Sequence, residues 1–252
     1  MTMKYSSLLA LVFFGLLATS QAQGTYRILT EEDPPFNFTQ NGEVTGYSAE
    51  AVTEIIKRSG GTGKIQVMEW DKAYQLAKQG PNTILFSMMR TDDRMGEFHW
   101  VGPIVIAELV ALVKSSSDLK TVTLDEAKKL KVGTINGWYS EHSLKKLGFK
   151  NLQLYPTSKD AVQALMTGQI DILAMTEASA MAEINAEGLG RESVRKVATL
   201  EQLPLYIAIS KDVPQKVINK WQDTLDEMAR DGTSRKINQK WLGEVFLSAP
   251  KN

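Results

Sequence analysis

Two rounds of alternating strand and helix patterns most constrain how this chain can fold. In each round, short apolar runs are followed by segments whose apolar residues lie three and four positions apart, as on one face of a helix. Such alternation predicts parallel sheets covered by helices. Two long apolar segments, Ile104–Val113 and Leu205–Ser210, separate the rounds and return the chain. We therefore predict an α/β protein with two lobes, each a mainly parallel sheet flanked by helices, joined by two crossover strands.

The local signals place most of the expected elements. A helix is expected to begin with Ser48 as its N-cap and to stop at Gly60, and a capping box from Thr123 to Glu126 opens a short helix. The other expected strands are Tyr26–Leu29, Lys64–Met68, Thr83–Met89, Val132–Ile135, Leu152–Tyr155 and Asp171–Met175, and the other expected helices are Trp70–Lys78, Ser140–Leu147, Ser158–Thr167, Pro214–Arg230 and Ser234–Leu242.

The N-terminus has the pattern of a secretory signal peptide. Lys4 gives a positive start, Leu8–Ala18 is apolar, and small residues at Ser20 and Ala22 suit a signal peptidase. The apolar run is too short to span a bilayer, which needs about 20 residues. No cysteine follows it, so a lipid anchor is not expected. We predict residues 1–22 as a cleaved signal peptide and a periplasmic location.

The predicted organisation of the remaining chain follows from the two crossovers. Residues 23–112 form the first part of lobe 1, residues 113–203 form lobe 2, and residues 204–252 return to lobe 1 and end in the C-terminal helices.

The composition argues against several classes of function. The 29 basic and 29 acidic residues cancel, so nothing indicates a nucleic-acid partner. There is no cysteine and there are only two histidines, so neither a metal site nor a cofactor is expected. The sequence contains no Gly-x-Ser-x-Gly elbow, phosphate-binding Gly-Lys-Ser/Thr loop or His-Glu-x-x-His motif, and we expect no enzymatic activity.

Arg94 is the leading candidate for ligand binding. It follows the strand Thr83–Met89, within the run Thr91–Arg94, and ligands of α/β sheets bind where strands end. A guanidinium can hold a carboxylate through two parallel hydrogen bonds. The competing interpretation is a solvated surface charge, or a pair between Asp92 and Arg94.

The sequence resembles a known family, the extracytoplasmic solute-binding proteins of family 3, which serve polar amino-acid ABC transporters. The resemblance covers essentially all of the chain after residue 22, and the order and spacing of its landmarks carry it. The landmarks are Pro34-Pro35-Phe36, Gly42 to Gly46-Tyr47, Trp70, Thr91 to Arg94, Phe98, Gly102-Pro103, Val132-Gly133, Asn136-Gly137, Ala164-Leu165 and Gly168 to Asp171.

This resemblance implies a monomeric two-lobed clamp that closes on a small carboxylate-bearing, amino-acid-like ligand and delivers it to a membrane ABC permease. It implies that Arg94 holds the ligand carboxylate, assisted by backbone amides at Trp138 and Tyr139. It also implies that the aromatic ring of Trp70 packs on the ligand. Ser87 and Met89, at the end of the strand that precedes Arg94, are further candidates for the binding site.

The chain departs from the family pattern where the ligand amine is held. The family's second-lobe aspartate corresponds to Thr176 here, followed by Glu177. Glu31, Glu32 or Glu177 could supply the missing carboxylate. Alternatively, the ligand lacks a free α-amine or is larger and more aromatic than a simple amino acid.

Two other functions remain open at the level of sequence. One is a ligand-sensing module that partners a membrane receptor. The other is a cyclohexadienyl-dehydratase-like enzyme, for which Glu177 is the obvious second-lobe acid.

Overall fold

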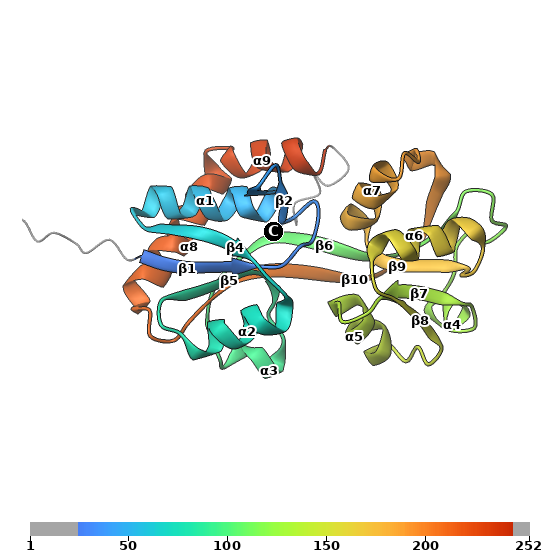
Figure 1. Cartoon of the computed structure of the whole chain (residues 1–252), viewed down its shortest axis with the longest axis horizontal. Coiled ribbons are helices and arrows are strands. Elements are labelled where there is room, and N and C mark those ends of the chain that lie inside the picture. The colour runs from blue at the N-terminus through green and yellow to red at the C-terminus, as the bar shows by residue number, and fades with distance from the viewer. Residues whose placement is uncertain (1–24, 244–252) are drawn as a thin grey trace, which may run out of the picture.

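The computed structural model describes residues 25–243, so the predicted signal peptide lies outside the described residues. The chain forms two lobes connected by two long strands, β6 (His99–Lys114) and β10 (Val194–Ile209) (Figure 1). We call the part built from β1–β5, α1–α3, α8 and α9 the first lobe. The part built from β7–β9 and α4–α7 is the second lobe. Within residues 25–243, no helix combines the length and the apolar character needed to cross a bilayer.

The remaining elements are short and alternate along the chain. The strands are β1 (Thr25–Thr30), β2 (Phe38–Gln40), β3 (Glu43–Thr45), β4 (Thr62–Val67), β5 (Thr83–Met89), β7 (Val132–Ile135), β8 (Leu152–Tyr155) and β9 (Ile172–Thr176). The helices are α1 (Tyr47–Ser59), α2 (Trp70–Gln79), α3 (Asp92–Met95), α4 (Leu124–Ala127), α5 (Tyr139–Lys146), α6 (Ser158–Thr167), α7 (Glu177–Ala186), α8 (Gln215–Arg230) and α9 (Thr233–Trp241), with a 3₁₀ turn at Arg191–Ser193.

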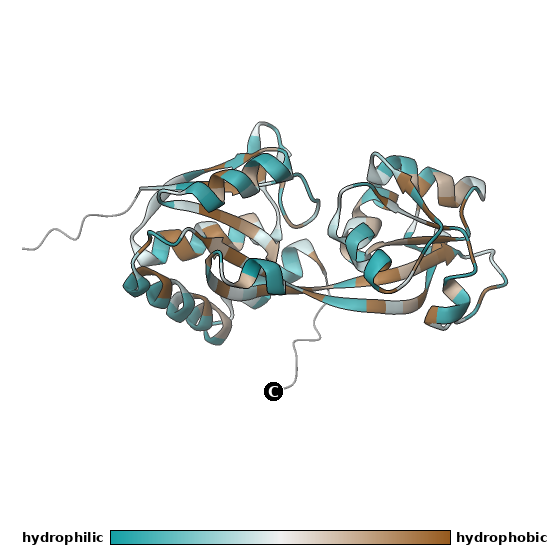
Figure 2. Ribbon diagram, turned by 90° about the horizontal axis from the view of Figure 1, so that it is seen from below, coloured by the Kyte–Doolittle hydropathy of each residue, from teal (hydrophilic) through white to brown (hydrophobic). Residues whose placement is uncertain are grey.

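A single sheet runs through both lobes in the order β4-β1-β5-β10-β6-β9-β7-β8. The pairs β1–β4, β1–β5, β7–β8 and β7–β9 are parallel, whereas β10 is antiparallel to β5 and β6, and β6 is antiparallel to β9. The crossover strands therefore pair with each other as well as with strands of each lobe. Seen from below, they form the narrow connection between the lobes (Figure 2).

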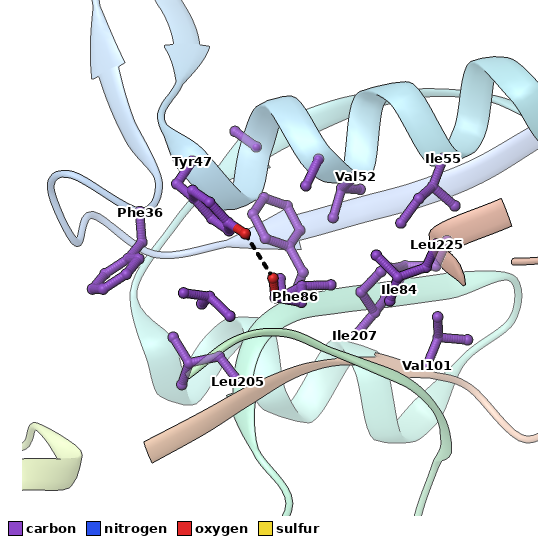
Figure 3. Close-up of a cluster of buried hydrophobic side chains, with 14 of the residues drawn as sticks. Phe36, Tyr47, Val52, Ile55, Ile84, Phe86, Val101, Leu205, Ile207 and Leu225 are labelled. Atoms are coloured by element: carbon purple, nitrogen blue, oxygen red, sulfur yellow. Dashed lines mark hydrogen bonds between the residues drawn. The ribbon is translucent and has the colours of Figure 1, made fainter. Parts of the chain in front are cut away.

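The core of the first lobe lies between α1, α8 and the sheet. Val52 and Ile55 on one face of α1 pack with Ile84 and Ile207 of the sheet, and all four side chains are fully buried (Figure 3). The Tyr47 hydroxyl donates to the Ile104 carbonyl at 2.9 Å, so this buried polar group is satisfied. This hydrogen bond joins the start of α1 to the first half of the crossover strand β6.

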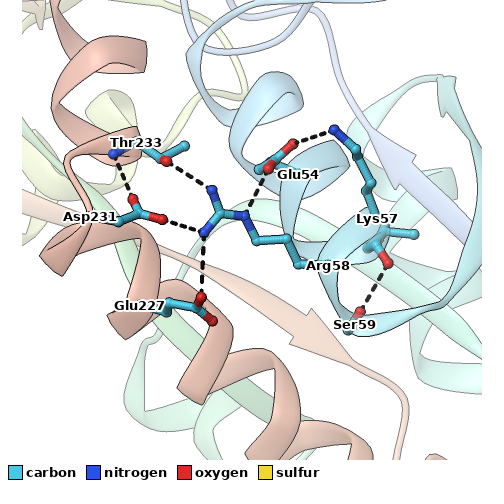
Figure 4. A network of polar contacts seen from close by, with 8 residues as sticks. Glu54, Lys57, Arg58, Ser59, Glu227, Asp231 and Thr233 are labelled. Carbon is cyan, nitrogen blue, oxygen red and sulfur yellow. Dashed lines mark hydrogen bonds and ion pairs between the residues drawn. The ribbon is translucent and has the colours of Figure 1, made fainter.

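A polar network connects the end of α1 to the C-terminal helices (Figure 4). Arg58 donates to Glu54 at 2.7 Å, to Asp231 at 2.5 Å and to the Thr233 hydroxyl at 2.8 Å. Asp231 and Thr233 lie at the junction of α8 and α9. The planar guanidinium suits such multiple acceptors, and the network holds three helices of the first lobe together.

The second lobe has its own core. Leu165 and Val162 of α6 pack on Leu173 and Met175 of β9, and Leu112 of β6 joins them. A second cluster on the other face of the sheet contains Val132, Leu144 and Phe149. Helices thus cover both faces, as expected for strands with apolar residues throughout.

Several expectations about the elements are confirmed and several are wrong. β5, β7, β8 and α6 have the predicted bounds, and the capping box at Thr123 is present. Ser48 is not an N-cap: Gly46 precedes the helix, and Ser48 is buried within its first turn. The sequence patterns missed α7, the β2–β3 hairpin and the first half of β10.

Candidate ligand-binding cleft

A cavity of about 430 Å³ opens between the two lobes. That volume falls in the usual range for small-molecule sites. The first lobe contributes residues from the ends of β1 and β5, the start of α2, and α3. The second lobe contributes the segment into α5 and the end of β9. The lining residues are Glu31, Asp33, Trp70, Asp71, Ser87, Met89, Thr91, Asp93, Arg94, Gly137, Trp138, Tyr139, Ser140, His142, Thr176, Leu203 and Leu205.

All eight residues predicted for the binding site line this cavity. They are Glu31, Trp70, Ser87, Met89 and Arg94 from the first lobe, and Trp138, Tyr139 and Thr176 from the second. Proximity of these residues is what the structure shows. Their roles toward a ligand stay predictions.

Arg94 lies in the short helix α3 and is partly buried. Its guanidinium lies 5.3 Å from the centre of the Trp70 ring and 5.4 Å from that of Tyr74, within cation–π distance. Trp70 and Tyr74 stack on each other at 6.2 Å along α2. Among residues 25–243, the guanidinium makes one hydrogen bond, a long 3.4 Å contact to the Met89 carbonyl.

Arg94 forms no ion pair with any carboxylate among residues 25–243. The predicted alternative, a pair with Asp92, is therefore wrong. Aromatic rings position the guanidinium from one side and leave most of its five donors available. The arrangement can accept an anionic group that enters the cavity.

A β-bulge directs Ser87 toward the cavity. Met88 pairs with Tyr206 and Phe86 pairs with Ile207, so Ser87 has no partner on β10. Its φ angle of 62° is left-handed, which a non-glycine residue rarely adopts. Bulges of this kind re-aim side chains next to functional sites. The Ser87 hydroxyl donates to the Asn37 side chain at 2.5 Å, an acceptor that sequence analysis did not anticipate.

The second-lobe side of the cavity is the start of α5. Trp138 is the N-cap position and Tyr139 is the first helical residue. The Tyr139 hydroxyl lies 3.4 Å from Glu201 on the crossover strand β10, and Ser143 also donates to that carboxylate. Glu201 thus links the aromatic wall of the cavity to one of the two strands that connect the lobes.

Asp33 lines the cavity but is not among the eight residues predicted for the binding site. Its carboxylate accepts a 2.8 Å hydrogen bond from Ser179 of α7, which belongs to the opposite lobe. The Ser179 hydroxyl also contacts the Thr176 hydroxyl at 2.7 Å. Burial raises the pKa of Asp33 to about 6, and the hydrogen bond from Ser179 partly opposes that rise. Asp33 therefore connects the cavity to a contact between the lobes.

Comparison with known proteins identifies the family to which this architecture belongs. The family model of the bacterial extracellular solute-binding proteins, family 3, matches residues 26–244. The chain belongs to this family. Among relatives, it is 25% identical to the probable amino-acid-binding protein YxeM of Bacillus subtilis (strain 168), over 99% of this chain and 100% of that protein.

Solved structures agree with the family. The solute-binding protein resembles an ancestral arginine-binding protein bound to arginine, with 28% identity, a TM-score of 0.73, and coverage of 88% of this chain and 99% of the other. A histidine kinase sensor domain, with 22% identity and a TM-score of 0.76, covers 88% of this chain and 97% of its own. At that identity, the sensor domain shows the fold alone.

Two further acids that were candidates for the ligand amine do not line the cavity of this solute-binding protein. Glu32 is exposed and accepts from the Thr39 backbone amide. Glu177 is buried and paired with Lys196 at 2.6 Å and Arg191 at 3.5 Å. Because its charge is already compensated by Lys196 and Arg191, Glu177 is not available to the cavity.

Glu31 of this solute-binding protein has a carboxyl group with a strongly raised pKa, about 8. Burial is the largest cause, and the charges of Asp33, Glu69 and Asp71 add to it, while Arg94 opposes it. The folded state therefore binds this proton more tightly than the unfolded state. By linkage, stability falls as the pH rises from about 4.5 to about 8.

We expect Glu31→Gln to restore part of the stability that the protein loses as the pH rises. Relative to the unsubstituted protein, the melting temperature of the unliganded variant should rise by at least about 2 °C at pH 8.5, which corresponds to about 1 kcal/mol at this size. At pH 4.5 the difference should vanish. Glu32→Gln is the control, since Glu32 is exposed, and calorimetric melting at both pH values is the measurement. An equal gain from both variants would contradict the account.

Proposed function

We propose that this family 3 protein captures a small carboxylate-bearing, amino-acid-like solute between its lobes and delivers it to a membrane ABC permease. One observation carries the proposal. A partly buried arginine lines the cavity without a carboxylate partner among the described residues, and most of its donors remain free. Trp70 beneath it and Trp138 opposite offer flat apolar surfaces for the body of the solute.

Closure of the lobes follows from the placement of these residues. Arg94 and Trp70 belong to one lobe, and Trp138, Tyr139 and Thr176 belong to the other. A solute that contacts both sets stabilises the closed form, because only that form offers all the contacts. We also propose that the protein is exported through the predicted signal peptide and acts as a monomer.

The proposal includes no catalysis. The acid suggested for a dehydratase, Glu177, is buried in ion pairs outside the cavity. Prephenate and arogenate incubated with the protein should give no aromatic product. Sensing for a membrane receptor would use the same cleft, and no residue of the described chain favours it over transport.

A thermal-shift screen of amino acids, small peptides, aromatic acids and amines tests the binding function. A solute at 100 times its dissociation constant adds about 2.7 kcal/mol of stability, which raises the melting temperature by at least about 5 °C for a protein of this size. We expect the compounds that give such shifts to carry a free carboxylate. If only amines without a carboxylate gave them, the assignment of Arg94 would be wrong. Uptake of the best compound by cells lacking this gene then tests delivery.

A further inference from the structure

The positive and negative side chains that line the cavity are unequal in number. Arg94 is the one arginine or lysine among the lining residues of the described chain, whereas four of them are acidic. Asp71 and Asp93 are exposed, and Glu31 and Asp33 are partly buried deeper in the cleft. His142 of the second lobe also lines the cavity and is exposed. A solute that brought only a carboxylate to Arg94 would leave the two inner acids uncompensated.

The fold leaves acceptor capacity unused on both inner acids. Asp33 accepts one hydrogen bond, from Ser179 to Oδ1, and Oδ2 has no partner among residues 25–243. The Glu31 carboxylate has no hydrogen bond or ion pair with any described side chain, although its backbone carbonyl accepts from Asn37. Glu177, by contrast, is buried outside the cavity and has two cationic partners. A carboxylate removed from water without a partner is unfavourable, so these two acids call for a cation from outside.

The chemistry of the site favours an organic cation over a metal ion. No group of three or more potential metal ligands is present in the part of the chain that the structure describes. Calcium takes six to eight oxygen ligands and magnesium demands an octahedral shell, and two carboxylates do not provide either. An ammonium or guanidinium group needs only one or two acceptors at hydrogen-bond distance.

Glu31 and Asp33 also lie where one solute can reach them together with Arg94. Both follow the end of β1 and line the cavity, whereas Glu32 between them is exposed, does not line it and accepts a hydrogen bond from the Thr39 backbone amide. The charges of both Asp33 and Arg94 act on the Glu31 carboxyl group. The three groups thus form one site, with a cation at one end and two acids at the other.

We propose that Asp33 and Glu31 hold the cationic groups of the solute, so that this cleft takes a cationic amino acid. The inference rests on the proposed function, in which Arg94 holds the carboxylate. One carboxylate and two cationic groups on the solute then match one arginine and two acids on the protein. The acid that corresponds to the second-lobe aspartate of the family, absent at Thr176, is supplied from the first lobe by Asp33.

Asp33 also couples recognition to closure. Ser179, on the opposite lobe, donates to the same carboxylate that faces the cavity. Hydrogen bonds to an ionised acceptor are stronger than those to a neutral one. A solute cation at Oδ2 keeps Asp33 ionised and so strengthens the bond from Ser179. Binding of the cation and contact between the lobes therefore support each other.

The raised pKa values of the two acids give the site a pH signature. A bound cation favours the ionised carboxylates, so it must displace protons at a pH below about 8 for Glu31 and below about 6 for Asp33. The charged groups that act on Glu31 are Asp33, Glu69, Asp71 and Arg94. Affinity for a cationic amino acid should accordingly rise between pH 6 and pH 8, with net release of protons.

Titration calorimetry with two matched pairs tests the inference: L-lysine against L-norleucine, and L-arginine against L-citrulline. In each pair the second compound keeps the carboxylate and the α-amine but lacks the side-chain charge. At pH 8 we expect the charged member of at least one pair to bind at least tenfold more tightly. Its affinity should fall at least threefold at pH 6, and the heat should depend on the ionisation enthalpy of the buffer.

Substitutions assign the effect to residues. Because Asp33 takes the α-amine, Glu31 is left for the side-chain cation. Glu31→Gln should weaken the charged member at least tenfold and the neutral member less than threefold. Asp33→Asn should weaken both members, since both carry the α-amine, and Glu32→Gln should change neither. Asparagine at position 33 can still accept from Ser179. Ser179→Ala, which removes the contact between the lobes but no charge, should weaken both members of a pair equally. Melting of each unliganded variant confirms that it is folded.

The possible failures are distinguishable. If the neutral members bind as tightly as the charged ones, if Glu31→Gln weakens both members equally, or if Asp33→Asn weakens neither, the cation site is wrong and the proposed function stands. If no compound with a carboxylate binds, in this set or in the wider screen, the proposed function fails and the cation site fails with it.

Discussion

Replacing Arg94 with alanine is expected to weaken the binding of a carboxylate-bearing amino acid at least about 30-fold, or about 2 kcal/mol. The guanidinium lies over Trp70 and Tyr74 and has no ion pair among the described residues. A bound carboxylate would be removed from water as the lobes close, and without Arg94 it would lose its charged partner. Titration calorimetry with the strongest compound from the thermal-shift screen measures the loss.

Two variants separate the anchor from a general effect of charge. Arg94→Lys keeps the charge but loses the planar pair of donors, and we expect a smaller loss than for alanine. Arg90→Ala removes an exposed arginine four residues away that does not line the cavity, and it should leave affinity unchanged. Wild-type affinity in Arg94→Ala, or an equal loss in Arg90→Ala, would show that the carboxylate is held elsewhere.

The sequence predicted the elements whose signals are local. β5 and α6 have the expected bounds because an apolar run in one, and a helical stripe ended by Gly168 in the other, can be recognised within a few residues. α7 was missed because its buried face is made of small residues such as Ala178 and Ala180, which give little periodic contrast. The β2–β3 hairpin had a usable signal, Asn41-Gly42, which is typical of a tight turn.

The candidate site was predicted in outline for a different reason. The resemblance supplied Arg94, Trp70 and the segment at Trp138, and the structure brings these distant residues to one cavity. The resemblance could not supply Asp33, because the family pattern places the aspartate that pairs with the ligand amine on the second lobe. Three consecutive acids also look alike in a sequence. Continuing the alternation of β1 past its end would have placed Glu31 and Asp33 on one side and Glu32 on the other.

The loop that carries Asp33 depends on Gly46. This glycine has a φ angle of 113°, and a Cβ atom added there would lie 2.6 Å from the Phe36 carbonyl oxygen and 2.8 Å from that of Pro35. Those two carbonyls accept from the first amides of α1, at 2.9 Å from Tyr47 and 2.7 Å from Ser48. The helix start can approach the loop this closely only because position 46 has no side chain.

Gly46→Ala is therefore expected to cost at least about 3 kcal/mol of stability, since the backbone strain and the clash with backbone atoms add. For a protein of this size, the melting temperature should fall by at least about 6 °C. Gly42→Ala is the control: its φ is also positive, at 81°, but a Cβ there meets nothing within 4 Å. It should lose only about 1 kcal/mol.

The same pair of variants tests how the fold positions the site. If the loop of Asp33 and Phe36 must shift to admit a Cβ at position 46, the folded fraction of Gly46→Ala should also bind a cationic amino acid more weakly, whereas Gly42→Ala should bind normally. Calorimetry at a temperature well below both melting transitions separates affinity from stability. Normal affinity in Gly46→Ala would mean that the first turn of α1 yields instead, and that the position of Asp33 does not depend on this contact.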